Sequence, residues 1–306
     1  MAAVVALDIG GSGIRVARVQ DGEILCRARL DLIPGTAPAK TADVLRDALN
    51  SLEPSPNDGA LGVAFPGFLD GAGRVLPGIY LPGFVGMDFV GTLGPLMSGR
   101  PMAVVPDVAA AALAEAAATG CGGRLLCVCL GTGANAALVA GGGVVDLAAG
   151  CLGDAGHIVV DPDGPRCTCG GRGCLEAICS GRALARDGAP LGFVDAAAVC
   201  GAARAEDRGA TDLLERAGRA LGRALSSWAV MTFPDVVFVT GGLSLAGELL
   251  LTPARSEMRR VGPPEIVARV DVRIGRCGAD AALLGAAIEA QRAQRAKSTP
   301  GQEAVA

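Results

Sequence analysis

The chain has 306 residues, of which 51% are hydrophobic, with 27 basic and 31 acidic side chains. A chain of this length and composition can bury a large core, so we expect a globular protein of two domains and not a disordered one. The formal net charge of −4 and the lack of any run of basic residues argue against nucleic-acid binding.

The N-terminal stretch VVALDIGGSGIRVARVQDGEIL, residues 4–25, predicts an apolar strand, a glycine-rich turn and two further strands. The turn at Gly10, Gly11 and Ser12 leaves backbone N–H groups uncovered by bulky side chains, as a chain needs where it closes around a phosphate. Asp8 lies beside this turn and is suited to hold Mg²⁺ or its water shell. An ordinary tight hairpin is the alternative interpretation.

A second stretch, LLCVCLGTGANAALVAGGGVV at residues 125–145, repeats the same plan. Its 21 residues carry no charge, which is the length of a membrane-spanning helix. Its glycines divide it into two short apolar runs, so we expect buried strands and no membrane span. Gly131, Thr132 and Gly133 form the second candidate phosphate turn.

Between the two hairpins, residues 61–65 form an apolar strand that Pro66 and Gly67 break, a common place for a binding loop. A short strand then runs through Val105 into Asp107, which begins an alanine-rich helix. Spacing alone favours Asp107 as the N-cap of that helix. The alternative role is a general base, and the two roles compete, because a carboxylate that accepts several backbone hydrogen bonds has a lowered pKa.

In the last third of the chain, residues 211–231 predict a long helix and residues 236–240 a strand that leads into Gly241 and Gly242. A planar ligand can approach the backbone closely at such a turn. A final helix at about residues 280–295 precedes a polar tail. Strands that alternate with helices predict an α/β protein whose sheets are covered by helices.

The single histidine, His157, precedes Cys167, Cys169 and Cys174, which have the spacing C-x-C-x₄-C. We predict that these four side chains hold a structural Zn²⁺ ion, since four protein ligands leave no open position for a water molecule. A cluster of buried thiols is the alternative. The imidazole nitrogen away from the metal would then be a fixed hydrogen-bond donor, so His157 can also orient a ligand, with Glu176 on the same stiffened frame.

The 11 cysteines are an odd set scattered from Cys26 to Cys277, and the first residues do not resemble a signal peptide. We therefore expect a reducing, cytoplasmic location.

Four motifs in chain order, LDIGGSGIRVA, CLGTG, GDAGH followed by CTCGGRGCLE, and FVTGG, resemble those of the ROK family of sugar kinases and sugar-responsive repressors. The resemblance implies an actin-like ATPase (ribonuclease H-like) fold, with two α/β domains and an interdomain cleft. We expect an N-terminal domain at residues 1–107, completed by the helix at about 280–295. A larger domain at residues 108–279 would carry the zinc loop, the second phosphate turn and the adenosine motif, and residues 296–306 would form a flexible tail.

The resemblance also implies transfer of the γ-phosphoryl group of MgATP to a hydroxyl of a hexose or hexose-like substrate, with Asp107 as the general base. The implied sugar contacts are Gly67, Asp107, Asp154, His157 and Glu176. The implied contacts of ATP and Mg²⁺ are Asp8, Gly10, Gly11, Ser12, Gly131, Thr132, Gly133, Gly241 and Gly242. The expected partners are a small sugar or polyol and ATP, without nucleic acid or membrane, and the family favours a homodimer.

Four positions depart from the family pattern. The family usually has Asn, whose amide binds a sugar hydroxyl, where this chain has Pro106, which offers no donor. Asp154 stands where Glu is usual, and Asn135 and Ala136 stand where glycines are usual. Two alternatives to a plain hexose kinase therefore stay open: a kinase for an unusual sugar or a cyclitol, and a non-catalytic sugar-binding protein of the same family.

Overall fold

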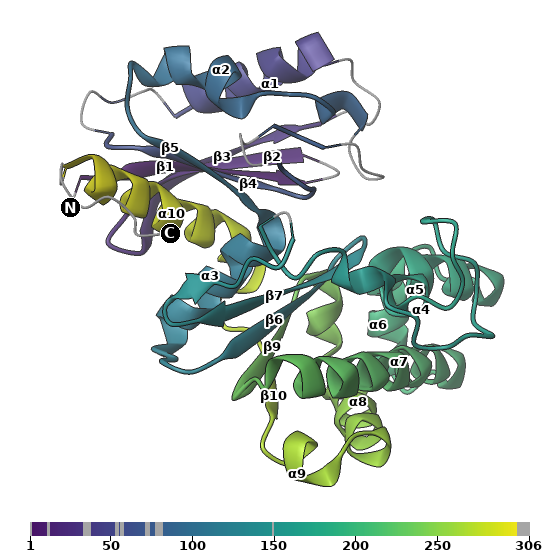
Figure 1. Cartoon of the computed structure of the whole chain (residues 1–306). Helices are drawn as coiled ribbons and strands as arrows, with labels where there is room; N and C mark the ends of the chain where they lie inside the picture. The colour runs from purple at the N-terminus through teal and green to yellow at the C-terminus, as the bar shows by residue number, and fades with distance from the viewer. Residues whose placement is uncertain are drawn as a thin grey trace. The chain divides into compact units, whose positions relative to one another are not determined.

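The computed structural model describes residues 2–10, 13–32, 38–52, 55, 58–70, 74–76, 82–148 and 150–298. The chain folds into two compact units, the first made of Met1–Ala114 with Asp280–Ala306 and the second of Glu115–Ala279 (Figure 1). Each unit holds one sheet of five described strands with helices packed on it. The predicted α/β class is therefore confirmed.

The sheet of the first unit has the strand order β3-β2-β1-β4-β5. β1 pairs antiparallel with β2, and β2 with β3, whereas β1, β4 and β5 are parallel. The first three strands are the predicted N-terminal hairpins. The elements of this unit are β1 (Val4–Gly10), β2 (Gly13–Gln20), β3 (Glu23–Asp31), α1 (Pro38–Asn50), β4 (Leu61–Phe65), α2 (Phe89–Leu93), β5 (Met102–Pro106), most of α3 (Asp107–Thr119) and α10 (Ala281–Ser298).

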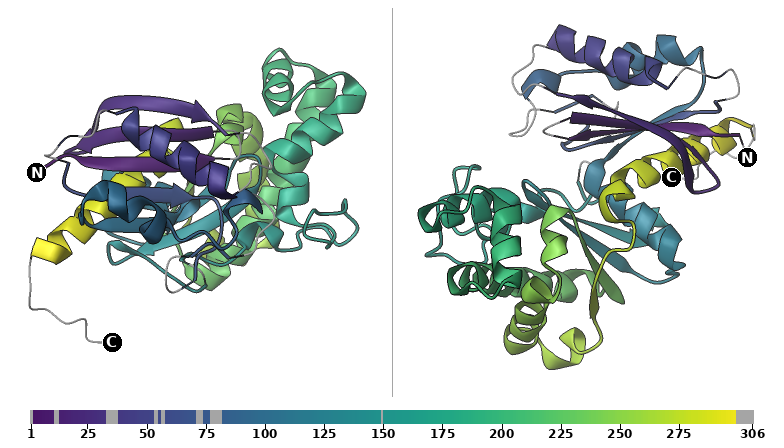
Figure 2. Two further views of the ribbon diagram at one scale, coloured as in Figure 1. Left: turned by 90° about the horizontal axis from the view of Figure 1, so that it is seen from above. Right: turned by 180° about the vertical axis from the view of Figure 1, so that it is seen from behind.

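The C-terminal helix α10 returns to the first unit and packs on β1, β4 and β5 (Figure 2). Two glycines allow this close approach. A Cβ atom at Gly62 would lie 1.9 Å from the carbonyl oxygen of Ala286, and one at Gly285 would lie 1.8 Å from that of Ala110. Because both obstacles are backbone atoms, any side chain at either position would push α10 off the sheet or off α3.

The second unit repeats this topology with the order β10-β9-β6-β7-β8. β6, β7 and β8 are antiparallel, and β6, β9 and β10 are parallel. The strands are β6 (Leu125–Leu130), β7 (Ala134–Ala140), β8 (Gly143–Val144), β9 (Val236–Thr240) and β10 (Asp271–Ile274). The helices are α4 (Leu175–Ile178), α5 (Gly181–Gly188), α6 (Ala196–Arg204), α7 (Arg208–Thr232), α8 (Glu248–Val261) and α9 (Pro264–Val267), with a 3₁₀ turn, η3, at Ala155–His157.

Residues 125–145 form strands and turns, as predicted. Within the described ranges, no helix is both long and apolar enough to cross a membrane.

The helix predicted at 211–231 is α7, which begins at Arg208. The side chain of Asp207 caps this helix by accepting a hydrogen bond from Ala210 N at 2.9 Å. One boundary was wrong: α10 continues to Ser298, so residues 296–298 of the expected tail are helical, and 299–306 lie outside the described residues.

The two long helices α7 and α8 are joined by a carboxylate that is almost fully buried. Glu257 is 4% exposed, and its two oxygens accept hydrogen bonds from Arg223 Nε at 2.9 Å and Arg260 Nε at 2.7 Å. These two arginines hold the pKa of Glu257 at about 2, with the bond from Arg260 as the larger cause. Arg223 also donates to the carbonyl oxygen of Val160 at 3.1 Å. Val160 precedes the loop that carries Cys167, Cys169 and Cys174, called the cysteine-rich loop below, so Arg223 connects the ion pair to the start of that loop.

We expect Glu257→Gln to reduce the free energy of unfolding of the second unit by roughly 2 kcal/mol at pH 7. The pKa of Glu257 is lower in the folded chain, about 2, than its ordinary value of 4.5. The stabilisation is therefore complete above pH 4.5 and disappears as the pH falls toward 2, so the variant and the wild type should converge in acid. Urea unfolding followed by the fluorescence of Trp228, which lies buried in α7, measures the difference.

The exposed Glu265, substituted to Gln, is the matched control and should leave stability unchanged at every pH. A stability difference for Glu257→Gln that is the same at pH 7 and pH 3 would contradict the assigned role.

Candidate functional site

Two carboxylates of the first unit lie at one edge of its sheet. Because β1, β4 and β5 are parallel, their carboxyl ends meet at the same edge, and the pairing sets Asp8 level with Ala64, and Ala64 level with Val105. Asp107 follows β5 directly as the first residue of α3. The two carboxylates are close enough for the charge of Asp8 to raise the pKa of Asp107.

Burial is the main cause that raises the pKa of Asp107 to about 7, and the charge of Asp8 adds to it. Asp107 Oδ1 accepts a hydrogen bond from Val108 N at 2.7 Å, which opposes the shift without cancelling it. Asp107 thus accepts a backbone hydrogen bond at the start of α3, and its pKa is nevertheless raised into the range in which a carboxylate can act as a base near neutrality.

The carboxylate of Asp8 has an ion-pair partner that the sequence analysis missed. Arg15 Nε donates to Asp8 Oδ2 at 2.8 Å, and Arg15 Nη1 lies 3.9 Å from Asp280 Oδ1. Burial raises the pKa of Asp8, and the guanidinium of Arg15 lowers it in part. The signal that could have found this pair is the hairpin register, in which Asp8 lies opposite Arg15.

The other predicted residues of the first unit are turn glycines. Gly10 ends β1 opposite Gly13, while Gly11 and Ser12 lie outside the described residues. Gly67 lies just beyond β4, at the edge that carries Asp107. A Cβ atom at Gly67 would lie 2.5 Å from Cε1 of Phe65, so the turn requires glycine there.

The second unit presents two glycine turns at one edge of its own sheet, since β6 and β9 are parallel neighbours. Gly131, Thr132 and Gly133 join β6 to β7, and the start of α5 binds the carbonyls of this turn, with Gly181 N 2.8 Å from Gly131 O. Gly241 follows β9 with a φ of +83°, and a Cβ atom there would lie 2.5 Å from Leu130 O. At Gly131 and Gly242 a Cβ atom would meet no other atom within 4 Å, so the backbone is open to a ligand at both turns.

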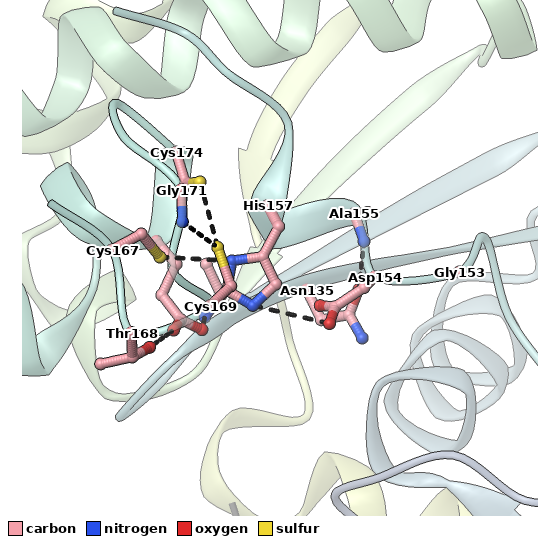
Figure 3. A network of polar contacts seen from close by, with 12 residues as sticks. Asn135, Gly153, Asp154, Ala155, His157, Cys167, Thr168, Cys169, Gly171 and Cys174 are labelled. Atoms are coloured by element: carbon pink, nitrogen blue, oxygen red, sulfur yellow. Dashed lines mark hydrogen bonds and ion pairs between the residues drawn. The ribbon is translucent and has the colours of Figure 1, made fainter. Parts of the chain in front are cut away.

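The predicted metal ligands gather at one point of the second unit (Figure 3). One ligand atom from each of His157, Cys167, Cys169 and Cys174 lies within 4.8 Å of the others. Cys167 Sγ is 3.4 Å from His157 Nδ1, and Cys169 Sγ is 3.7 Å from Cys174 Sγ. Zinc–sulfur bonds of about 2.3 Å in a tetrahedron imply edges of about 3.8 Å, so both pairs fit a tetrahedral ion.

The other ring nitrogen of His157 faces a carboxylate. His157 Nε2 lies 3.5 Å from Asp154 Oδ2, and Figure 3 shows the imidazole between Asp154 and the thiols. Burial raises the pKa of Asp154, and the charge of His157 opposes that shift. A carboxylate on the outer nitrogen fixes the tautomer and the ring orientation of a metal-binding histidine.

Glu176 ties the cysteine-rich loop to the sheet. Its side chain is 3% exposed, and Oε2 accepts a hydrogen bond from Ala134 N at 3.0 Å. Thr168 Oγ1, inside the loop, lies 3.4 Å from Glu176 Oε1. Glu176 therefore orders the loop directly beside the second glycine turn.

Within each unit, the structure brings the predicted residues together. The first unit groups Asp8, Gly10, Gly67 and Asp107 at one sheet edge. The second unit groups Asp154, His157 and Glu176 with the cysteines, and places the turns that follow β6 and β9 at one edge.

Comparison with known proteins gives a family model and several related sugar kinases. The family model described as "ROK family" matches residues 4–293. An N-acetylmannosamine kinase from Shigella flexneri is 33% identical, over 94% of this chain and 98% of its own. A glucokinase from Thermotoga maritima is 30% identical, over 93% and 96%.

Among solved structures, a ROK family glucokinase from Streptomyces griseus, in complex with glucose and AMPPNP, superimposes with a TM-score of 0.81 at 28% identity. The match covers 95% of this chain and 99% of that one. The predicted actin-like ATPase fold is confirmed by this likeness, and the chain belongs to the ROK family.

Proposed function

We propose that this protein is an ATP-dependent sugar kinase that transfers the γ-phosphoryl group of MgATP to a hydroxyl of a hexose or hexose-like substrate. The observation that carries the proposal is Asp107, a carboxyl with a pKa of about 7 beside a second carboxylate at a sheet edge. Membership of the ROK family and similarity to an N-acetylmannosamine kinase and a glucokinase support it.

Asp107 is the general base in this mechanism. Its carboxylate accepts the proton of the acceptor hydroxyl as the oxygen attacks the γ-phosphorus, and the bond from that phosphorus to the β,γ-bridging oxygen breaks. A base is most useful when its pKa lies near the working pH, which a value of about 7 satisfies.

The glycine turns bind the nucleotide. Gly10, Gly11 and Ser12 in the first unit, and Gly131, Thr132 and Gly133 in the second, offer backbone N–H groups to the phosphates. Gly241 and Gly242 form the floor under the adenosine, because only glycine leaves the backbone open to a planar ring there.

Two metal ions fit the residues present. Asp8 offers carboxylate oxygens of the type that Mg²⁺ takes along with water, and Mg²⁺ neutralises phosphate charge when bound. Three thiols and an imidazole in near-tetrahedral spacing fit Zn²⁺. This chain's own contribution is to hold Asp154, His157 and Glu176 in fixed orientations, and with Gly67 these residues contact the sugar.

Pro106 bears on the non-catalytic alternative, because a proline before the base could displace it. In the structure, Pro106 stays in register with Phe65 at the end of β5, and Asp107 follows at the sheet edge. This regular geometry favours a working enzyme over a silent binding protein. The lack of a donor on Pro106 still leaves an unusual sugar or a cyclitol as the alternative acceptor. The homodimer and the cytoplasmic location stay predictions.

We expect Asp107→Asn to lower kcat by at least about a hundredfold while the Kd for sugar changes little, because the amide keeps the shape of the carboxyl but accepts no proton. Coupled ADP detection over a panel of hexoses and cyclitols measures turnover, and calorimetry measures binding. Asp47→Asn, at an exposed position of α1, is the matched control. Turnover of Asp107→Asn within threefold of wild type would remove Asp107 from the mechanism.

The pKa of about 7 for Asp107 also predicts the pH dependence of kcat/KM. The base must be unprotonated, so kcat/KM should fall about tenfold per pH unit below 7 and level off above it. A carboxyl with its ordinary pKa of 3.8 would instead give a flat profile from pH 5 to 8. Initial rates at low substrate concentration between pH 5 and 9 distinguish the two profiles.

The metal assignment predicts about one zinc per chain, measured by plasma mass spectrometry of protein purified without added metal. Cys169→Ser should lose the zinc and raise the Kd for sugar at least about tenfold, because His157 and Asp154 lose their fixed orientation. Cys26→Ser, an exposed cysteine outside the cluster, should retain both zinc and affinity. Full sugar affinity in a zinc-free Cys169→Ser protein would refute the structural role of the metal.

A further inference from the structure

We propose that Asn135 determines substrate specificity, acting with Asp154 to recognise one free hydroxyl of the acceptor. The proposal rests on the proposed function and deepens it. It narrows the acceptor to hexoses or cyclitols that present a hydroxyl, and not an N-acyl group, to this pair of side chains.

The first observation is that the orientation of the Asn135 carboxamide is determined by its partners. Asn135 Oδ1 accepts hydrogen bonds from Ala136 N at 2.8 Å and from Ala155 N at 3.1 Å. Both partners are backbone donors, so the oxygen end must face them and Nδ2 must point away. The bond to Ala155 also places the carboxamide against the backbone just after Asp154, as Figure 3 shows.

The second observation concerns the Nδ2 group itself. In the described part of the chain, Nδ2 of Asn135 has no hydrogen-bond partner, and no buried side-chain nitrogen or oxygen is left without one. Nδ2 is therefore exposed to solvent, and it presents two donor hydrogens on a fixed frame. A donor fixed in this way loses little entropy when it binds a ligand.

The third observation is that Asp154 is arranged in the complementary way. Its Oδ2 faces His157 Nε2 at 3.5 Å, and the side chain is 31% exposed. Its Oδ1 has no hydrogen-bond partner among the described residues. Asn135 thus keeps its oxygen end bonded to the protein and offers a donor, whereas Asp154 faces His157 with Oδ2 and offers Oδ1 as an acceptor.

A neighbouring donor and acceptor match a hydroxyl, because one hydroxyl oxygen can accept from Nδ2 while its proton is donated to the carboxylate. A trans N-acyl amide does not match, since its N–H and its carbonyl point to opposite sides of the planar group. Only one of the two could meet the pair, and the other side chain would be left desolvated without a partner.

The test uses Asn135→Asp, which keeps an oxygen for the two backbone donors, changes the outer end from donor to acceptor and adds a negative charge there. Calorimetry measures the Kd of glucose, its 2-, 3- and 4-deoxy analogues, and N-acetylglucosamine, and of mannose with N-acetylmannosamine. In the wild type, we expect the loss of one particular hydroxyl, or its replacement by an N-acetyl group, to raise the Kd at least about tenfold. In Asn135→Asp, the same change of sugar should raise the Kd less than about threefold.

Asn50→Asp makes the same chemical change at an exposed position of α1 and should leave every Kd unchanged. Melting curves of both variants show whether the fold is retained. A second variant, Asn135→Ser, removes the side-chain amide, and its Kd values for the same sugars test the loss of discrimination independently. The inference is overturned if the wild type prefers the N-acyl sugars, or if both Asn135 variants keep the full increase in Kd. Turnover by the wild type on any of these sugars would uphold the proposed function in those cases, whereas absence of both binding and turnover would overturn both.

Discussion

The parallel pairing of β1, β4 and β5 is the constraint on which the chemistry of the first unit depends. It brings Asp8 and Asp107, 99 residues apart in the numbering of the chain, to one sheet edge, where the charge of one raises the pKa of the other. Arg15 and Asp280 in turn shift the pKa of Asp8, so the electrostatic surroundings of Asp107 involve three other side chains. A shift of β1 by one residue would turn Asp8 to the other face of the sheet and remove its charge from the neighbourhood of Asp107.

In the second unit, hydrogen bonds and ion pairs hold polar side chains in fixed positions within irregular backbone. Glu176 and Asn135 fasten the loop segments to β7, and Arg223 joins the base of the cysteine-rich loop to the ion pair of α7 and α8. The four candidate metal ligands lie at the far end of the same loop. Groups that are oriented before binding lose less freedom when a ligand arrives, which is the property that the proposed sugar site requires.

Family membership alone does not identify the acceptor, because an N-acetylmannosamine kinase and a glucokinase match this chain at 33% and 30% identity. Glucose and N-acetylmannosamine differ at a single ring carbon, in its substituent and its configuration, which a few side chains can distinguish. Pro106, Asn135, Ala136 and Asp154 are the positions where the sequence departs from the expected family pattern, and a hydrogen bond from Ala155 N to Asn135 joins the segments that carry Asn135 and Asp154. Their chemistry therefore carries more information about the substrate than overall similarity does.

The sequence by itself determined those features that depend on residues close together in the chain. Glycine turns after apolar strands, alternating residues in the hairpins, and three cysteines within eight residues of one another depend on local geometry and could be recognised directly. The return of α10 to the first unit was anticipated from the family resemblance, but its contact through Gly62 and Gly285 was not. Only the tertiary structure decided the pairing of Arg15 with Asp8, the pKa of Asp107 and the orientation of Asn135. Each of these depends on burial and on partners brought close by strand pairing or loop packing, and such proximity is not encoded in the spacing of residues along the chain.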